Sequence, residues 1–156
     1  MITVKQQDGR GNHTLFMMLL ALIMFSGISY ADFIRSNGVV KDNKTGLHWQ
    51  DDYSDNGNSI KFTTWVAAIE YCETLSLDGG GWRLPNKKEL LSIVDYGRDN
   101  LSIDTVFLNT ANTDSNYYWS STTYAGDTDN AWAVVFDYGG TPNYSKSYDC
   151  YVRCVR

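Results

Sequence analysis

The stretch "LDGGGWRLPNKKELLSIVD" limits the fold more narrowly than any other part of the chain. Three consecutive glycines at residues 79–81 cannot continue a helix, so they end the helical pattern before them. Pro85 disfavours helix at the residue before it, and Asn86 is a good N-cap with Glu89 at the N3 position, as in a capping box. We therefore expect two short helices, one on each side of the glycines.

The first helix is predicted from residues that recur at helical spacing before the glycines: Trp65, Ala68, Ile69, Cys72 and Leu75. Either Thr63 or Thr64 can cap its start. The helix is therefore amphipathic, and Cys72 lies on its apolar face.

Strands are predicted on either side of the two helices. Residues 38–50 are expected to form a hairpin, because two valines lead into the turn-rich "DNKTG". After the helices, "NYYWSSTTY" and "NAWAVVFDY" are rich in aromatic and β-branched residues, and "CYVRCVR" is a terminal strand. This order predicts an α+β fold in which two helices pack on a twisted antiparallel sheet with long loops.

The N-terminal segment is not expected to belong to this domain. A weakly basic start precedes an apolar run, and small residues up to Ala31 follow it, as in a secretory signal peptide. The alternative is a transmembrane anchor, but the run is shorter than the ~20 residues of a span and is interrupted near its end. We expect cleavage of residues 1–31 and no membrane span afterwards. Residues 32–156 then form one exported domain in the periplasm, at the cell surface or outside the cell.

The exported domain is acidic. Loss of Lys5, Arg10 and Asp8 with the leader reduces 13 basic and 18 acidic residues to 11 and 17, a net charge of −6. Such a surface repels nucleic acid and anionic lipid, so neither is an expected partner. His48 is the single histidine of this part. Metal sites with several histidines are therefore excluded, and His48 has no evident acid or nucleophile partner for catalysis.

Cys150 and Cys154 lie four residues apart at the C-terminus. This spacing suggests a metal site, a redox site, or one half of a disulfide beside an unrelated thiol. In a regular strand their Cα atoms are about 13 Å apart, at ~3.3 Å per residue. A disulfide needs Cα atoms within ~7 Å, and one metal ion with ~2.3 Å thiolate bonds cannot bridge the gap. A direct link needs a bulge or a turn, and the alternatives stay open at this point.

The polar turn between the two aromatic strands is the best local set of ligand groups. Asp127, Asp129 and Asn130 offer oxygen ligands that can hold Ca²⁺. The alternative is an ordinary Asp/Asn turn. No other cofactor is expected.

The strands beside this turn carry aromatic residues that can form a stacking platform for sugar rings: Tyr117, Tyr118, Trp119, Tyr124 and Trp132. In an alternating strand about half of them must face the core. We expect Trp119 and Trp132 to pack inside, and Tyr118 and Tyr124 to be exposed for a ligand.

Two arginines are expected to act structurally. Arg83 and Glu89 can be interpreted as a catalytic ion pair, but Arg83 is better explained as a hydrogen-bonding hub and Glu89 as a helix cap. Arg153 is expected to anchor to a carboxylate. No residue is assigned to catalysis.

Six motifs in a fixed order resemble the C-terminal domain family of the Legionella collagen-like protein: "TGLHWQ", "TWVAAIEYCETL", "GGGWRLPNKKELLSIVD", "YYWSSTT", "AWAVVF" and "VRCVR". The resemblance spans residues 38–156 and implies a C-type-lectin-like fold. These motifs contain the residues expected to be structural: Trp49, Trp65, Trp82, Arg83, Pro85, Glu89, Trp119, Trp132 and Arg153. The resemblance also implies a disulfide between Cys72 and Cys154, which suits an oxidising compartment. The collagen-like repeat is absent, so its trimerisation stalk is not assumed.

A second resemblance supplies an alternative function. "WRLP" before a capped helix, and "VRC" near the end, are similar to the formylglycine-generating sulfatase-modifying enzymes, which share this fold. Those enzymes bind copper through a nearby cysteine pair to activate oxygen. Their spacing is one residue longer than that of Cys150 and Cys154, and a bond from Cys154 to Cys72 leaves no such pair.

We therefore expect an exported, non-catalytic recognition or adhesion module that binds a glycan or a protein at the cell surface or in the extracellular matrix. The alternative is a copper-dependent oxidoreductase. The family resemblance implies glycosaminoglycan binding, but the charge of −6 favours a neutral glycan, peptide or protein. The "EPN" and "WND" triplets of calcium-dependent lectins are absent from the sequence, so calcium-dependent sugar binding is not carried over.

Overall fold

The computed structural model describes residues 32–98, 101–113 and 116–156. The predicted signal peptide lies outside the described residues. The described chain folds into two α-helices, two short 3₁₀ helices and two mostly antiparallel sheets. The α+β fold class is therefore confirmed.

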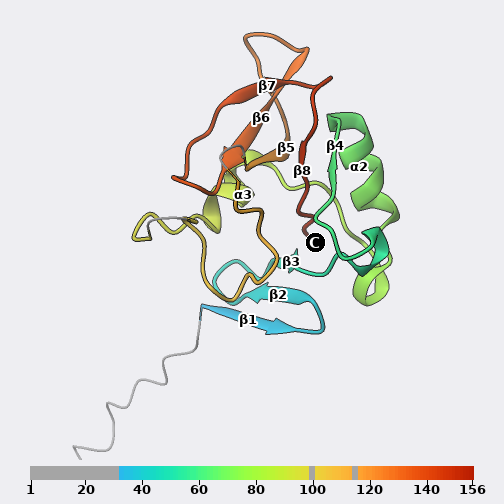
Figure 1. The fold of residues 1–156 in the computed structure, drawn as a ribbon, viewed down its shortest axis with the longest axis vertical. Helices are drawn as coiled ribbons and strands as arrows, with labels where there is room; N and C mark the ends of the chain where they lie inside the picture. Colours follow the sequence, from blue (N-terminus) through green and yellow to red (C-terminus); the bar gives the residue numbers. More distant parts are fainter. Residues whose placement is uncertain (1–31, 99–100, 114–115) are drawn as a thin grey trace, which may run out of the picture. The chain divides into compact units, whose positions relative to one another are not determined.

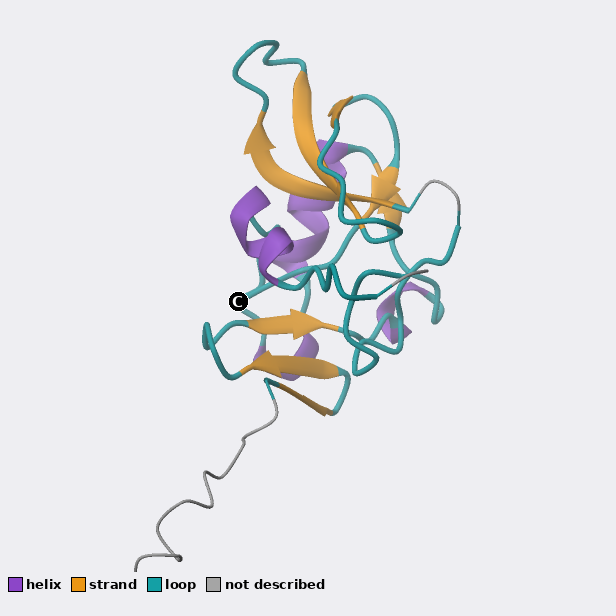
Figure 2. Cartoon of the chain, turned by 90° about the vertical axis from the view of Figure 1, so that its left-hand side faces the viewer, coloured by secondary structure: helices purple, strands orange, loops and turns teal. Residues whose placement is uncertain are grey.

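The N-terminal sheet pairs its three strands in chain order, all antiparallel (Figure 2). The strands are β1 (Phe33–Ser36), β2 (Val39–Asp42) and β3 (His48–Gln50). Asp42 closes the turn between β2 and β3, because its carboxylate accepts hydrogen bonds from the Lys44 amide (2.8 Å) and the Thr45 hydroxyl (2.6 Å). The hairpin predicted over residues 38–50 is confirmed.

The second sheet has the strand order β4-β8-β5-β6-β7 (Figure 1). Its strands are β4 (Phe62–Thr63), β5 (Tyr117–Thr123), β6 (Asn130–Val135), β7 (Asn143–Ser145) and β8 (Cys150–Tyr151). Neighbouring strands are antiparallel except β8 and β5, which are parallel where Tyr118 lies beside Tyr151. The expectation of a wholly antiparallel sheet is wrong at this pair, because the chain end enters the sheet between β4 and β5.

The helices α2 (Trp65–Thr74) and α3 (Lys87–Ser92) are the two predicted ones. The capping box of α3 is confirmed. The Asn86 side chain accepts a bond from the Glu89 amide (2.9 Å), and the Glu89 carboxylate accepts one from the Asn86 amide (2.8 Å). Thr64 is the N-cap of α2, but its hydroxyl makes no capping bond. The cap position was therefore predicted correctly and the capping interaction was not.

The chain between the helices contains the 3₁₀ turn η2 (Leu77–Gly79), and another, η1 (Ser54–Asn56), precedes β4. All three glycines at positions 79–81 have positive φ angles, of 90°, 80° and 80°. L-residues with side chains rarely adopt such angles, so glycine suits these positions at the end of η2 and after it. The expectation that the glycines end the first helix is wrong, because α2 stops at Thr74 and Leu75 is its extended C-cap.

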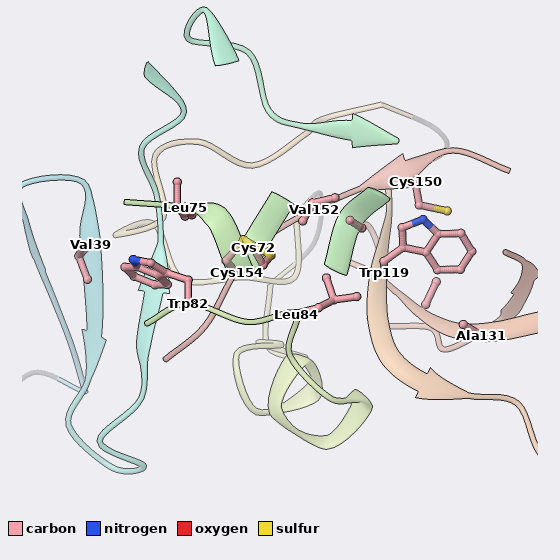
Figure 3. Close-up of a cluster of buried hydrophobic side chains, with 12 residues drawn as sticks. Val39, Cys72, Leu75, Trp82, Leu84, Trp119, Ala131, Cys150, Val152 and Cys154 are labelled. Carbon is pink, nitrogen blue, oxygen red and sulfur yellow. A yellow bond between two sulfur atoms is a disulfide. The ribbon is translucent and has the colours of Figure 1, made fainter. Parts of the chain in front are cut away.

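Two buried clusters lie on opposite faces of the second sheet. Trp119 belongs to the cluster on the α2 side and its neighbour Tyr118 to the other, because successive strand residues point to opposite faces. The first cluster contains the disulfide between Cys72 and Cys154, with Cα atoms 5.4 Å apart (Figure 3). The bridge joins α2 to the end of the chain. It confirms the pairing that the family resemblance implies.

The C-terminal segment also connects the two sheets. Val155 is fully buried and forms antiparallel bridges with Trp49 of β3 and with Arg83 before α3. Gln50 strengthens this connection, because its amide donates to the Cys154 carbonyl (2.9 Å) and its side-chain oxygen accepts from the Cys154 amide (3.2 Å). Residues 150–156 are therefore central to the fold.

Candidate functional site

The turn predicted to bind calcium connects β5 to β6 and is bonded to itself. One Asp127 carboxylate oxygen accepts from the Asp129 amide (3.1 Å), and the other accepts from the Asn130 side-chain amide (3.1 Å). Both oxygens are used inside the turn, whereas Ca²⁺ takes about six to eight oxygen ligands. The turn has the hydrogen bonds of an ordinary Asx turn, and alone it supplies too few oxygens for calcium.

Tyr118 is fully buried, so the expectation that it is exposed to a ligand is wrong. Its ring packs edge-on against Phe136, with centroids 5.0 Å apart, and its hydroxyl accepts a 2.8 Å bond from the Ala111 amide. Burial raises the pKa of Tyr118. Both faces of β5 are covered here, so alternation along the strand does not produce an exposed aromatic face.

The other aromatic residues of the predicted platform differ in burial. Trp119 is fully buried, as expected, and its indole NH donates to the Thr63 carbonyl (3.0 Å). Trp132 is only partly buried: Tyr124 meets it edge-on at 5.2 Å, and the Lys87 ammonium lies 3.3 Å from its ring centroid. A cation therefore already covers one face of Trp132, which reduces the area left for a sugar ring.

Arg83 and Glu89 form a two-pronged ion pair, with N–O distances of 2.8 and 2.6 Å. The Arg83 guanidinium holds the pKa of Glu89 below its ordinary value. Because Glu89 also caps α3, both carboxylate oxygens have structural partners. This geometry supports the structural interpretation of the pair.

Other residues expected to be structural bond to backbone groups. The indole NH of Trp65 donates to the Ser120 carbonyl (2.8 Å), and that of Trp82 donates to the Leu77 carbonyl (2.6 Å). The Pro85 carbonyl accepts from the Ser121 amide (2.8 Å), which attaches the start of α3 to β5. Trp49 is fully buried in the second cluster.

The cysteine pair at the C-terminus does not form a site. Cys154 is bonded to Cys72, and Cys150 is a buried free thiol beside Trp119 and Ala131 (Figure 3). Burial raises the pKa of the Cys150 thiol to about 12. The thiolate is the form that attacks or binds metal. Cys150 is therefore protonated at neutral pH and lacks a second thiol at position 154.

Arg153 lies at the centre of a buried polar network. Its side chain is fully buried and pairs with the equally buried Asp51 at 3.2 Å, which confirms the expected carboxylate anchor. The same guanidinium donates to the Asn109 carbonyl (2.7 Å) and to the Thr110 hydroxyl (2.9 Å), and it lies over the Phe107 ring at 4.7 Å. One carboxylate, the Gln50 carbonyl (3.2 Å) and the loop of residues 107–110 thus contact the charge, while the buried Nε has no hydrogen-bond partner among the described residues.

Asp51 fixes the same loop from its own side. Its carboxylate accepts bonds from the backbone amides of Leu108 (3.0 Å) and Asn109 (3.1 Å), and from the Arg35 side chain (2.6 Å). The Asn109 side-chain amide donates to the Asp51 carbonyl (2.7 Å). Loop residues 108–110 are therefore held by several bonds to buried groups.

This loop forms part of an open groove of about 560 Å³. One side is lined by three residues before β4, by one residue of β4 and by one residue of β8: Asn58, Ser59, Ile60, Phe62 and Tyr151. Loop residues complete it: Leu108, Asn109, Thr110, Ala111 and Thr113. The volume lies within the range of about 300–1,000 Å³ that is usual for ligand sites. None of the described lining residues is charged.

Apolar side chains are unusually exposed at this groove. Phe62 is 52% exposed although its ring packs on Tyr151 with centroids 4.8 Å apart, and Leu108 is 68% exposed. Sequence reasoning missed these residues, because each is a single apolar residue in a polar segment. An isolated apolar residue in a polar segment was the only signal for Phe62 and for Leu108. The fold is needed to show that their two segments lie together.

A second cavity, of about 410 Å³, contains several carboxylates. Asp42, Asp95 and Asp104 each accept a bond from the backbone amide two residues ahead, so they serve their own turns. Among the residues that the structure describes, no group of three or more His, Cys, Asp and Glu side chains can hold a metal ion. The uncharged groove is the better candidate site.

The family of the chain follows from comparison with known proteins. No helix in the described part of the chain is long and apolar enough to cross a membrane. No curated protein matches the chain. The family model for the Lcl C-terminal domain matches residues 38–156, which is most of the sequence. The chain therefore belongs to the Lcl C-terminal domain family.

Proposed function

We propose that residues 32–156 form an exported, non-catalytic recognition module that binds an uncharged glycan or protein segment in the groove. Family membership suggests a non-enzymatic extracellular module. The finer parts are our proposal: a lectin-like fold, export through cleavage after Ala31, and adhesion at a cell surface or matrix. The protein then acts by binding and carries out no reaction.

One observation carries this proposal: residues that line the uncharged groove are hydrogen-bonded to a buried ion pair. Leu108, Asn109 and Thr110 line the groove, and each is bonded to Asp51 or Arg153. A wall fixed before binding loses little conformational freedom when the ligand arrives, and this increases affinity. The buried ion pair thus fixes the conformation of the surface residues that line the groove.

The charge distribution selects among ligands. The exported part has a net charge of −6, and no Lys or Arg belongs to the described lining of the groove. A sulfated or nucleic-acid polyanion would find no ion pair there and would be repelled by the rest of the surface. An uncharged ligand is not subject to this repulsion.

The copper-dependent oxidoreductase is less well supported. Its site requires Cys150 and Cys154 together as thiolates, but Cys154 is in a disulfide and Cys150 is 1% exposed. Reduction of the bridge would release Cys154 and would also remove the covalent link between α2 and the chain end. No observation in the described residues favours this second function.

An array of neutral glycans and surface proteins tests the proposal when it is probed with the chain displayed in many copies, because multivalency reveals weak binding. We expect the double change Phe62→Ala with Leu108→Ala to abolish the signal. Tyr148→Ala is the matched control, because Tyr148 is an aromatic residue of similar exposure, 61%, outside the groove. Equal loss in both variants would contradict the groove assignment.

Export is tested by mass spectrometry of the protein recovered from cells. We expect a chain that starts near Asp32.

A further inference from the structure

The exposed apolar surface of the groove is an aromatic ring held in a fixed orientation. Phe62 packs against Tyr151 at 4.8 Å with the ring planes tilted by 53°, and Tyr151 packs in turn on the buried Tyr118 at 5.5 Å. Phe62 is nevertheless half exposed. A ring supported from below and open to solvent suits the apolar C–H face of a sugar ring, which stacks on aromatic side chains.

Uncharged polar groups surround this ring. The side chains of Asn58, Ser59 and Thr113 line the groove and make no hydrogen bond to the described residues. Asn58 and Thr113 each offer both donors and acceptors. Sugar hydroxyls also donate and accept, so these groups match them.

The buried network orients two more polar groups. Thr110 Oγ1 accepts a bond from Arg153, which leaves its hydroxyl proton available to donate. The Asn109 side-chain nitrogen donates to the Asp51 carbonyl, which leaves its oxygen available to accept. One donor and one acceptor are thus fixed beside each other along the loop, as adjacent hydroxyls of a sugar require.

Two alternatives fit the groove less well. An acidic saccharide needs a cation, but the nearest lysine in sequence, Lys61, has its ammonium 5.5 Å from the Tyr71 ring centroid, and it does not line the groove. An extended peptide that adds a strand needs free backbone groups at a sheet edge. The adjacent edge strand β4 has two residues, and the Thr63 carbonyl is already bonded to Trp119.

We propose that the groove binds a neutral saccharide, with one ring stacked on Phe62 and its hydroxyls bonded by Asn58, Asn109 and Thr110. This inference rests on the proposed recognition function and specifies its ligand class. Because the groove is open, a single sugar unit keeps part of its surface in water, and we expect dissociation constants of about millimolar.

The test is a titration of the full chain, residues 1–156, in which NMR monitors binding. The probes are methyl glycosides of glucose, galactose, mannose and N-acetylglucosamine, their β-linked disaccharides, heparin as a polyanion, and a library of capped, uncharged hexapeptides. We expect at least one neutral saccharide to bind. Phe62→Ala should weaken it about fivefold to tenfold, whereas Phe62→Trp should retain it.

Controls separate loss of the site from loss of the fold. Tyr148→Ala should leave saccharide binding unchanged. Asn58 has a positive φ of 61°, which Gly adopts readily and Ala does not, so Asn58→Gly removes this exposed polar side chain without backbone strain. We expect it to weaken binding about threefold to tenfold with little change in the melting temperature. A neutral hexapeptide that binds in a Phe62-dependent way, with no saccharide binding, would overturn this inference and leave the recognition function standing. Preferred binding of heparin would overturn the neutral assignment. Absence of binding by every probe would contradict both.

Discussion

Arg153 and Asp51 lie 102 residues apart in the sequence and form an ion pair of 3.2 Å in which both side chains are fully buried. Charges are removed from water only at a large cost, which this pair offsets through bonds to the loop of residues 108–110. Such a pair is weak evidence for stability, and we propose that this one serves to define a structure. Here the defined structure is the wall of the groove.

The first prediction concerns this pair. Arg153→Met leaves Asp51 buried with Arg35 as its remaining cation, so we expect a loss of about 3–5 kcal/mol in the free energy of unfolding. Arg156→Met is the matched control, because Arg156 pairs with the partly exposed Asp78 and should cost only about 1 kcal/mol. Urea unfolding measures both. Equal losses in the two variants would contradict the interpretation that Arg153→Met leaves an uncompensated buried charge at Asp51.

The second prediction concerns the disulfide. Its 82-residue separation gives up to about 4.5 kcal/mol in the chain-entropy model, so Cys72→Ser and Cys154→Ser should lower the melting temperature strongly and equally. The double variant should be no less stable than either single one, because one interaction is lost. Cys150→Ala should have a small effect. A peptide map that joins Cys150 to Cys154 would contradict the pairing.

The third prediction concerns pH. Arg83 lowers the pKa of Glu89 in the folded chain, so the stabilisation by this carboxylate is present above its unfolded pKa of about 4.3 and is lost as the pH falls through the lower folded value. Arg83 is half exposed and solvent screens the pair. We expect Glu89→Ala to cost about 1 kcal/mol at pH 7, mainly through the lost cap, and less at pH 3. Glu70→Ala, on the exposed side of α2, should show no such pH dependence. If the difference in the free energy of unfolding between Glu89→Ala and the unchanged chain is the same at pH 3 and pH 7, the effect of Arg83 on Glu89 is refuted.

The fourth prediction separates the groove from the turn between β5 and β6. Asp127 and Asn130 bond to each other, and Trp132 is covered by Lys87. We therefore expect Asp129→Ala and Tyr124→Ala to leave ligand binding unchanged, and a calcium chelator to have no effect. Isothermal titration with any ligand found on the array measures this. If these changes abolish binding while Phe62→Ala does not, the turn is the site.

Local signals in the sequence predicted both helices and the start of α3, but not the end of α2, which stops at Thr74 before the glycines. The capping box of Asn86 and Glu89 involves residues three positions apart, and the glycines at 79–81 act through their own backbone angles. The partner of Cys72 lies 82 residues away and came from the family resemblance rather than from spacing. Local patterns therefore predicted the elements, and the resemblance predicted one distant contact.

The groove could not be predicted in this way. The strand order places Phe62 beside Tyr151 of β8, and bonds to Asp51 hold Leu108 on the other side of the groove. Nothing near Phe62 or Leu108 in the sequence indicates these contacts. Tyr118 was misplaced because both neighbours in "YYW" are aromatic and both faces of β5 are covered, so neither pattern nor residue type distinguishes inside from outside. Such features depend on contacts distant in sequence.

Mapping of backbone amide shifts tests the central claim most directly. Isotope-labelled chain is titrated with the tightest ligand from the array, and the shift of each amide is followed to saturation. The groove account predicts the largest shifts at residues 58–62 and 108–113, with smaller ones at Asp51 and Arg153 behind the wall. Largest shifts at residues 124–130, with residues 58–62 and 108–113 unchanged, would contradict it.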